Sequence, residues 1–282
     1  MTLGGDARWG QLRAVSTTIA FLGSGRLASA IIRGLIQRGG MSPQNIRCTS
    51  KHGESARALA EELGVVFEPD LEALLAPADV VVLAFKPQSL ASADQRLATL
   101  TRGKLVISLL AGKRLSLLAS ILPGAQNIVR TMPNTPAAVG AGITPYCSLV
   151  TLNSDEECVV GSILRPLGSF LPLEEQHMDA VTALSAGGPA FLFEHLCALR
   201  DGGIAVGLPA ETATLLAIET FIGAARLLAE SKKSPESLRD EVVSPNGTTA
   251  AGLAELSHAA FRQTVANSIA KATARATELS GA

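Results

Sequence analysis

Short apolar runs alternate with amphipathic stretches along the first half of the chain. Residues 18–22 form an apolar run that ends in glycine, a pattern typical of a buried parallel strand. Leu27 to Gln37 then carries apolar residues at helical spacing until Gly39. The alternation continues, with strands predicted over 46–49, 65–67, 80–83, 105–109 and 128–131 and helices over 54–63 and from the cap Asp70 to Leu75. Strands separated by helices predict right-handed crossovers and a parallel sheet, so the fold class is α/β.

The second half of the chain has a helical pattern. Ser154 to Glu157 resembles an N-cap with an acidic first turn, and this helix is expected to run to about Leu167. Further helices are predicted over 190–206, from Pro209 to about 231, and over 235–242, 248–257 and 261–280. Several of them are apolar on more than one face, which a region of about 110 residues does not easily bury by itself. We therefore expect these helices to pack between subunits.

The composition narrows the class of protein. The chain has 282 residues, a hydrophobic fraction of 47% that excludes global disorder, and a formal net charge of −1. This charge and an aromatic fraction of 4% argue against binding of nucleic acid or of an anionic membrane surface. The apolar run Val80–Phe85 is far shorter than the roughly 20 residues of a membrane span, and the first 16 residues lack the hydrophobic region of a secretion signal. The four cysteines form no CxxC pair, so we expect reduced thiols and a cytoplasmic protein.

A glycine-rich turn follows the first predicted strand. Residues 23–28, GSGRLA, match G-x-G-x-x-G/A between a strand and a helix, the context in which this pattern binds a dinucleotide. Gly23 permits the tight turn, Gly25 lets backbone N–H groups approach a pyrophosphate, and Ala28 permits close packing of helix on strand. The partial positive charge of the helix N-terminus favours the same anion. A purely structural turn is the alternative.

The residues at the end of the second predicted strand indicate whether the site prefers NADPH or NADH. Sites for NAD place Asp or Glu here to accept the ribose 2′-hydroxyl, whereas residues 49–52 read Thr-Ser-Lys-His and no carboxylate comes before Glu54. Hydroxyls and a cation suit a 2′-phosphate, so the sequence favours NADPH over NADH. A solvated loop with an incidental Lys51 is the alternative.

Two further loops follow strands at the edge of the sheet where ligands bind. Residues 84–88, AFKPQ, contain Lys86, for which contact with the cofactor and solvation are equal alternatives, and Pro87, which fixes the loop. Residues 130–136, RTMPNTP, form a rigid loop that is expected to line the nicotinamide pocket, with a stiff connector as the alternative.

Two loops of small residues precede helices in the second half. Residues 185–190 read SAGGPA, and residues 244–252 read SPNGTTAAG. In the second loop, Gly247 and two threonines combine free backbone N–H groups with hydroxyls, which makes an anion site of carboxylate size without a cation. Helix capping alone is the alternative for both loops.

Other kinds of catalytic site are not indicated. The four histidines have no metal-ligand spacing, so no metal is expected, and the sequence contains no G-x-S-x-G elbow and no Walker loop. His195 lies in an apolar helical stretch and is expected to be a core or interface residue.

The order of these motifs resembles the pyrroline-5-carboxylate reductase family, which catalyses the last step of proline biosynthesis. The resemblance runs from about Thr18 to Leu279 and rests on the sequences FLGSGRLASA, FKPQ, RTMPNTPAAVGAG, ALSAGGPAF and VVSPNGTTAAGL. With the patterns above, we expect a flexible tail over residues 1–16, an N-terminal Rossmann-type doubly wound sheet that binds NAD(P) over residues 17–173, and an all-helical dimerisation and substrate-binding region over residues 174–282. The resemblance implies a homodimer, which in many members of the family assembles further into a homodecamer.

The resemblance also implies an activity and site residues. NADPH, or NADH, is the hydride donor to the cyclic iminium of 1-pyrroline-5-carboxylate, with L-proline as the product. The residues that match the cofactor site are Gly23, Ser24, Gly25, Arg26 and Leu27 for the pyrophosphate, Ser50 and Lys51 near the adenosine ribose, and Ala84, Lys86 and Pro87 beside the cofactor. The residues that match the substrate carboxylate site are Ser244, Gly247, Thr248 and Thr249, and Thr249 is the candidate for the polar group near the imine.

The sequence departs from the family pattern at three places near the proposed pocket. Residues 185–191 read SAGGPAF where the family usually has S-G-S-G-P-A-Y, so one serine and one tyrosine hydroxyl are missing. Asn246 stands at a glycine position, where its tolerance of left-handed backbone preserves the loop, and Ser234 stands at a histidine position.

Three alternatives follow from these departures and from the layout. A reductase of another cyclic imine, such as a six-membered homologue, and a non-catalytic NADP-binding protein of the same fold both stay open. A β-hydroxyacid dehydrogenase shares the two-part layout, but that family places a catalytic Lys in the first long helix of the second region. Residues 191–206 contain no Lys, which argues against this third alternative.

Overall fold

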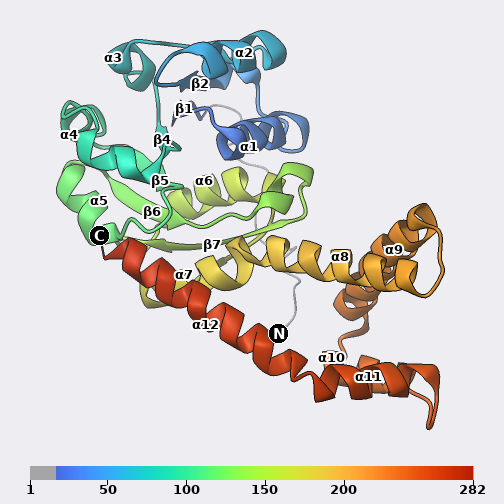
Figure 1. Cartoon of the computed structure of the whole chain (residues 1–282). Helices are drawn as coiled ribbons and strands as arrows, with labels where there is room; N and C mark the ends of the chain where they lie inside the picture. Colours follow the sequence, from blue (N-terminus) through green and yellow to red (C-terminus); the bar gives the residue numbers. More distant parts are fainter. Residues whose placement is uncertain (1–16, 282) are drawn as a thin grey trace. The chain divides into compact units, whose positions relative to one another are not determined.

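A computed structural model describes residues 17–281, and the tail predicted over residues 1–16 lies outside the described residues (Figure 1). The described residues form two compact units. Unit 1 comprises the residues up to Ala186 together with those from Thr273 onward, and unit 2 comprises Gly187–Ala272.

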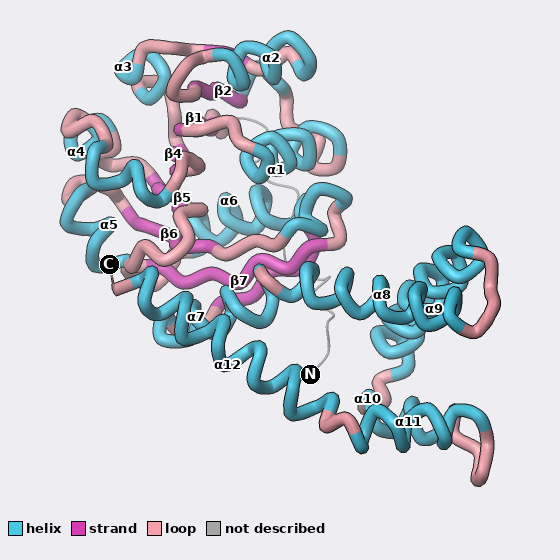
Figure 2. The backbone as a smooth tube through the Cα atoms, viewed as in Figure 1, coloured by secondary structure: helices cyan, strands magenta, loops and turns pink. Residues whose placement is uncertain are grey.

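Unit 1 is built on one eight-stranded sheet, whose strands are drawn in magenta in Figure 2. The strands lie in the order β3-β2-β1-β4-β5-β6-β7-β8, with β1 to β6 parallel and β7 antiparallel to β6. They are β1 (Ile19–Leu22), β2 (Ile46–Thr49), β3 (Val66–Phe67), β4 (Val80–Leu83), β5 (Leu105–Ser108), β6 (Asn127–Thr131), β7 (Gly142–Ser148) and β8 (Gly168–Pro172). Because the chain leaves β1 toward β2 on one side and returns at β4 on the other, the switch point of the sheet lies between β1 and β4.

Helices cover both faces of this sheet, which is why its central strands are continuous apolar runs. In β1, Ile19 and Phe21 belong to the core on one face, and Ala20 and Leu22 belong to the core on the other. The first face is covered by α1 (Arg26–Gln37), α2 (Glu54–Leu63) and α6 (Ser154–Leu164), and the second by α3 (Leu71–Leu75), α4 (Leu97–Leu100), α5 (Leu115–Ile121) and α7 (Met178–Val181).

The sequence pattern missed two strands and the short helices α4, α5 and α7, and it misplaced one helix cap. β7 and β8 were not predicted, because Gly142, Pro145 and Gly168 interrupt the alternation of apolar and polar residues there. The cap of α6 is Asn153 rather than Ser154, and its side chain forms a capping box with Glu156. α6 ends at Leu164 and continues as a 3₁₀ turn, Arg165–Leu167.

The segment that follows β8 packs with unit 1. Met178 is fully buried in the core on the second face of the sheet, and Ala183 is buried in a π-helical turn, Thr182–Ala186. The compact units therefore divide after Ala186, whereas the sequence places the limit between residues 173 and 174.

Unit 2 contains α8 (Gly188–Ala205), α9 (Ala210–Ser231), α10 (Pro235–Val242), α11 (Thr248–His258) and the first part of α12 (Phe261–Ser280). These bounds agree with the sequence prediction to within two residues at each end. α8 and α9 pack along each other, because Gly203 of α8 leaves room for Ala213 of α9.

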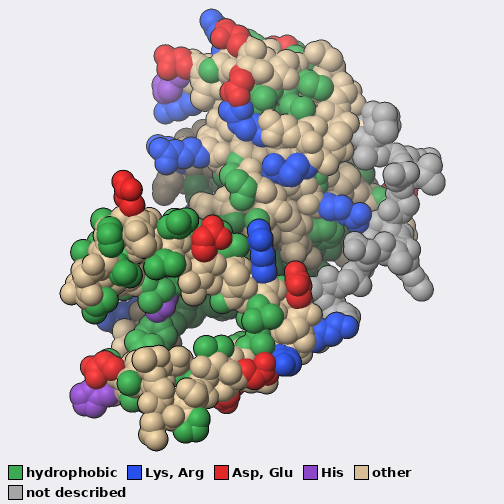
Figure 3. Space-filling view, turned by 90° about the vertical axis from the view of Figure 1, so that its right-hand side faces the viewer, with side chains coloured by type: hydrophobic (Ala, Val, Ile, Leu, Met, Phe, Trp, Pro, Cys, Tyr) green, Lys and Arg blue, Asp and Glu red, His purple; other side chains and the backbone are tan. Residues whose placement is uncertain are grey.

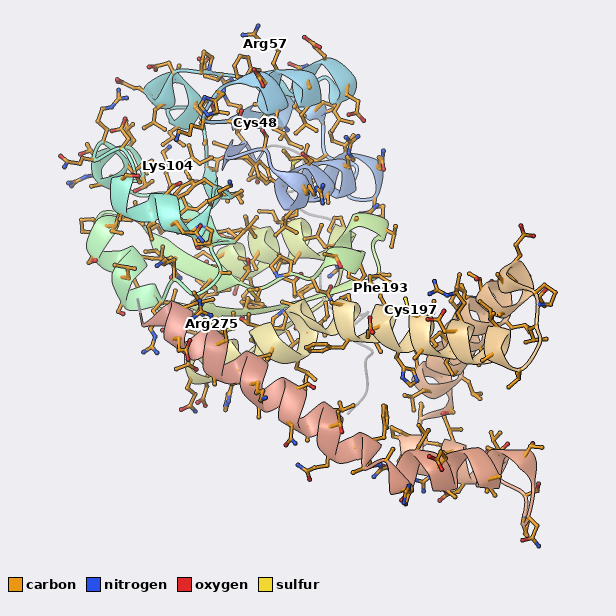
Figure 4. The ribbon with its side chains drawn as sticks, viewed as in Figure 1. Cys48, Arg57, Lys104, Phe193, Cys197 and Arg275 are labelled. Carbon is orange, nitrogen blue, oxygen red and sulfur yellow. The ribbon has the colours of Figure 1, made fainter. Side chains whose placement is uncertain are left out.

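Unit 2 buries few apolar side chains within one chain. Among its described residues the buried apolar ones are Ala213 and Ala217, whereas Phe193, labelled in Figure 4, is 64% exposed. Figure 3 shows hydrophobic side chains in green on the surface of the helices. The exposed ones on α8 and α9 include Phe191, Leu192, Phe193, Leu199, Ile204, Leu215, Leu216, Ile218, Ile222, Leu227 and Leu228. A surface this apolar is typical of an interaction site.

One helix of unit 2 has the length and the apolar composition of a membrane-spanning helix. Of the described helices, α9 alone is long and apolar enough to cross a bilayer, and 11% of its apolar window is buried within the chain. A helix with this property fits a subunit interface equally well, because both environments cover apolar side chains.

Candidate functional site

The glycine turn lies at the switch point of the sheet. Gly23 has a φ of 114°, and its N–H donates to the Thr49 carbonyl at 3.0 Å. A Cβ added at Gly23 would lie 2.5 Å from the carbonyl oxygen of Ala84, the residue after β4. Only glycine therefore lets β1, β2 and β4 end side by side.

The space in front of α1 is open. Gly25 is the N-cap of α1 in extended conformation, and a Cβ added to it would meet no atom within 4 Å. No side chain caps the helix, so its first N–H groups face this space. Ser24 is buried and shares a hydrogen bond of 2.7 Å with the Ser55 hydroxyl, so it serves the site through its backbone. Arg26 is exposed at the first helical position, and Leu27 packs against the core.

The end of β2 offers hydroxyl and cationic groups. The Ser50 Oγ atom is buried and has no hydrogen-bond partner, and the neighbouring Lys51 is exposed. Arg57, labelled in Figure 4, lies on the next helix with its guanidinium 5.4 Å from the centroid of the Phe67 ring. An orphaned hydroxyl beside an exposed cation fits a ribose phosphate, which accepts hydrogen bonds from both.

The loop that follows β4 contacts the glycine turn between β1 and α1. The Ala84 N–H donates to the Leu22 carbonyl at 2.9 Å, so the two strand ends are joined. Lys86 is exposed, and Pro87 begins a 3₁₀ helix, Pro87–Ser92. The structure thus brings the segments that carry the residues assigned to the cofactor to the neighbouring carboxyl ends of β1, β2 and β4. Its open glycine, uncapped helix and orphaned hydroxyl fit the pyrophosphate and ribose of a dinucleotide.

The predicted carboxylate loop lies in unit 2, between α10 and α11. Asn246 adopts left-handed backbone with a φ of 59°, as the sequence predicts for this position. Gly247 is the N-cap of α11, which no side chain caps, and its own N–H donates to the Ser244 carbonyl at 3.0 Å. Ser244, Thr248 and Thr249 are exposed at this helix N-terminus. Uncapped N–H groups beside three hydroxyls fit a small anion without a cation, which is the kind of site that the sequence predicts here.

Sequence reasoning missed the main role of Arg130. The loop over residues 130–136 was assigned to the nicotinamide pocket, yet the Arg130 side chain is 5% exposed and pairs with Glu175 at 2.9 Å and Asp179 at 3.7 Å. Asn134 in the same loop donates to the Ser185 carbonyl at 3.2 Å and accepts the Ile143 N–H at 3.0 Å. Glu175 and Asp179 lie 45 and 49 residues further along the chain, so local patterns gave no sign of these partners.

The thiols and His195 in the described part of the chain show no sign of a reactive or metal-binding site. Burial raises the pKa of the Cys48 and Cys147 thiols to about 11, so both stay protonated near neutral pH (Figure 4 labels Cys48). His195 is half-buried, and its ring centroid lies 5.6 Å from that of Phe221 and 5.5 Å from that of Phe261. No three His, Cys, Asp or Glu side chains of residues 17–281 converge on a possible metal site.

The sheet, its glycine turn and the separate helical unit define a class, the dinucleotide-binding oxidoreductases. A family profile described as "Pyrroline-5-carboxylate reductase dimerisation" matches residues 175–279, and one described as "NADP oxidoreductase coenzyme F420-dependent" matches residues 18–112. Pyrroline-5-carboxylate reductases of Glycine max and Arabidopsis thaliana are 36% and 37% identical to this chain, covering 95% of it and 97% of each relative. The chain belongs to the pyrroline-5-carboxylate reductase family.

Solved structures agree with this assignment. A pyrroline-5-carboxylate reductase from Coxiella burnetii superposes with a TM-score of 0.87 at 35% identity, covering 94% of this chain and 99% of that one. The Plasmodium falciparum enzyme with NADP bound superposes with a TM-score of 0.85 at 28% identity and the same coverage. The family resemblance and the α/β fold predicted from the sequence are confirmed.

The dimerisation profile explains the apolar surface of unit 2. It spans α8 to α12, whose large side chains are exposed within one chain. Copies of the chain cover these side chains by packing on one another, so the protein is a homo-oligomer that acts on a small molecule.

Proposed function

We propose that this protein reduces 1-pyrroline-5-carboxylate to L-proline with NADPH, as an NAD(P)H-dependent oxidoreductase acting on a C=N bond in proline biosynthesis. The observation that carries the proposal is that a chain of this family has both required parts. These are an open dinucleotide cradle in unit 1 and a neutral carboxylate loop in unit 2.

The cofactor is held mainly by backbone groups of unit 1. Gly23, Gly25 and the first N–H groups of α1 bind the pyrophosphate, with Ser24, Arg26 and Leu27 supplying backbone. Ala84, Lys86 and Pro87 flank the cofactor beside β4. When bound, the reduced nicotinamide supplies the hydride for the reaction.

The coenzyme is NADPH rather than NADH. Ser50 and exposed Lys51 follow β2, and residues 49–52 contain no carboxylate that would accept a ribose 2′-hydroxyl or repel a 2′-phosphate. The orphaned Ser50 hydroxyl gains a partner when the ribose end binds, which removes the cost of a buried unsatisfied group.

The substrate is oriented by its carboxylate. Ser244, Gly247, Thr248 and Thr249 bind this group through hydroxyls and the uncapped N–H groups of α11. The cyclic imine is protonated to an iminium, which accepts a hydride at carbon while the nitrogen keeps its proton. The protein therefore needs no strong acid, and its task is to hold the ring at near-attack distance, with Thr249 hydrogen-bonded near the imine nitrogen.

The assembly begins with a homodimer through unit 2, and dimers associate into a homodecamer. The dimer is supported by the dimerisation profile and by the exposed apolar faces of α8 and α9, whereas the decamer is what the resemblance to the family implies. We place the enzyme in the cytoplasm, since pairing of α9 between subunits accounts for its apolar composition without a membrane. Residues 17–173 then form the NAD(P)-binding region and residues 174–282 the dimerisation and substrate-binding region.

A spectrophotometric assay tests the proposal. Purified protein is mixed with NADPH and 1-pyrroline-5-carboxylate, and in parallel with the six-membered homologue, while NADPH absorbance is followed and proline is measured. We expect faster NADPH oxidation with the five-membered substrate and one proline for each NADPH consumed. Faster turnover of the six-membered imine would reassign the substrate. NADPH binding without turnover of the two imines would mean a non-catalytic NADP-binding protein.

A further inference from the structure

One cluster of polar side chains in unit 1 joins the segment that precedes the exit to unit 2 with the segment that follows the return from it. Arg130, at the end of β6, donates to Glu175 at 2.9 Å and lies 3.7 Å from Asp179. The Ser280 hydroxyl, at the last residue of α12, has two acceptors, an Asp179 carboxylate oxygen at 2.9 Å and the Thr277 carbonyl of its own helix at 3.0 Å. Asp179 therefore joins the segment that leads out to α8 with the helix that returns.

The outgoing segment is fixed at several points before it leaves unit 1. Glu175 accepts the N–H of Leu115, the first residue of α5, at 2.7 Å, in addition to its pair with Arg130. Three residues after Asp179 begins the π-helical turn Thr182–Ala186, which ends at the limit of the unit. Its Ser185 carbonyl accepts the Asn134 amide. Turns of this kind are frequent at functional sites, because the extra residue frees a carbonyl from the helix ladder.

The returning segment is fixed only near its end. Ala276 and Ser280 are buried, whereas residues 261–268 at the beginning of α12 are exposed within one chain. A Cβ added at Gly112, in the turn between β5 and α5, would lie 3.2 Å from the Leu279 carbonyl oxygen. The last turn of α12 thus packs on the turn that follows β5, at the ligand-binding edge of the sheet.

The contacts of Arg130 with Glu175 and Asp179 require the planar shape of a guanidinium group. One buried guanidinium faces two carboxylates from different turns, and its planar fork serves both, which an ammonium group does not do as well. Each carboxylate has a second donor, the Leu115 N–H for Glu175 and the Ser280 hydroxyl for Asp179. Charges that are paired and hydrogen-bonded in this way resist displacement, since separating them leaves a buried charge uncompensated.

We propose that Arg130, Glu175, Asp179 and Ser280 form an anchor that fixes both points of attachment of the helical unit, and that Arg130 and Ser280 are positioning residues for imine reduction. This inference rests on the proposed function, because the cofactor cradle belongs to unit 1 and the carboxylate loop to unit 2. A reaction that needs near-attack distance between two ligands is sensitive to movement at these attachments.

The test compares two serines of α12 in the full-length oligomer. Ser280→Ala removes the link to Asp179, and Ser268→Ala removes a hydroxyl that donates only to the Thr264 carbonyl of its own helix, at 2.9 Å. For Ser280→Ala we expect faster hydrogen exchange over residues 273–280 and 175–186. We also expect kcat/KM for the imine to fall on the order of two- to thirty-fold, with the dissociation constant of NADPH, from fluorescence titration, unchanged. Ser268→Ala is expected to match the wild type in all three measurements.

Substitutions at Asp179 and Arg130 distinguish a role in positioning the helical unit from a general role in protein stability. Asp179→Asn keeps an acceptor for Ser280 and is expected to preserve slow exchange at the end of α12, whereas Asp179→Ala is expected to lose it. Arg130→Lys keeps the charge without the fork and is expected to give an intermediate loss of kcat/KM. A purely structural role would instead weaken NADPH binding and imine turnover together.

The outcomes distinguish this proposal from the proposed function. If Ser280→Ala exchanges and turns over like Ser268→Ala, the anchor proposal is overturned while the reductase activity stands. If the wild type does not oxidise NADPH with either imine, the proposed function fails, and the exchange measurements alone then decide whether the anchor exists.

Discussion

At the scale of single residues, the sites proposed for the two ligands offer different chemistry. Lys51 is the exposed cation of the proposed phosphate site, whereas Ser244, Thr248 and Thr249 are the exposed neutral hydroxyls of the proposed carboxylate site. Substitutions at the two places should therefore separate coenzyme preference from imine affinity.

The Thr249 hydroxyl is expected to contribute to imine binding and turnover. Thr249→Ala removes one hydrogen bond to a charged ligand, which corresponds to about tenfold in kcat/KM, mainly through a higher KM. Steady-state kinetics with 1-pyrroline-5-carboxylate measure this. Thr214→Ala is the control, because that hydroxyl donates to the Ala210 carbonyl within α9. Near wild-type kinetics for Thr249→Ala would remove this residue from the site.

The Lys51 ammonium group is expected to set the preference for NADPH. Lys51→Ala loses one charge-assisted hydrogen bond to the 2′-phosphate, so KM for NADPH should rise about tenfold while KM for NADH changes little. Lys271→Ala, an exposed lysine of α12, serves as the control. An unchanged ratio of the two KM values would show that other groups read the ribose.

At the scale of elements, the turn between β1 and α1 needs glycine at two positions for two reasons. Gly23 has left-handed backbone and touches the Ala84 carbonyl, whereas Gly25 is extended and faces open space. Glycine is needed at position 23 because the folded backbone leaves no room for a side chain there. At position 25, glycine is proposed to leave room for the ligand.

Alanine substitution is expected to separate these two requirements. Gly23→Ala should lower the free energy of unfolding by about 1–3 kcal/mol through backbone strain, seen as a lower Tm. Gly25→Ala should leave Tm unchanged and weaken NADPH binding by about 1–3 kcal/mol, because the methyl group fills space meant for the pyrophosphate. Calorimetry and fluorescence titration measure the two effects, and equal loss of Tm in the two variants would contradict the distinction.

The sequence predicts well those helices and strands whose apolar periodicity and caps lie within the element itself. The strands from β1 to β6 and the helices of unit 2 follow from apolar periodicity and from caps such as Asp70, whose carboxylate accepts the Ala73 N–H. β7 and β8 depend on pairing with distant strands, and Gly142 and Pro145 hide them. The ion pairs of Arg130 are likewise set by tertiary contact, which no window of neighbouring residues reveals.

At the scale of the whole molecule, the helical unit depends on its partner copies. Many of its large apolar side chains are exposed in one chain, so we expect association of copies to bury them. Phe193→Asp places a charge in this apolar surface and is expected to yield monomers with little activity, measured by sedimentation and by NADPH oxidation. Leu117→Asp, at an exposed position of α5 in unit 1, is the control. An intact oligomer for Phe193→Asp would place the interface elsewhere on unit 2.

The carboxylate loop has a consequence for the response of the enzyme to salt. Residues 243–252 contain no Lys or Arg, so a substrate anion bound at this loop as proposed would contact backbone N–H groups and hydroxyls and no cationic side chain of the loop. Ionic screening acts over about 8 Å at physiological salt and hardly weakens such contacts, whereas it weakens the attraction of Lys51 for a phosphate. Raising potassium chloride should therefore increase KM for NADPH and leave KM for the imine nearly level. The KM for NADPH would then depend on the ionic strength of the solution, whereas the KM for the imine would not.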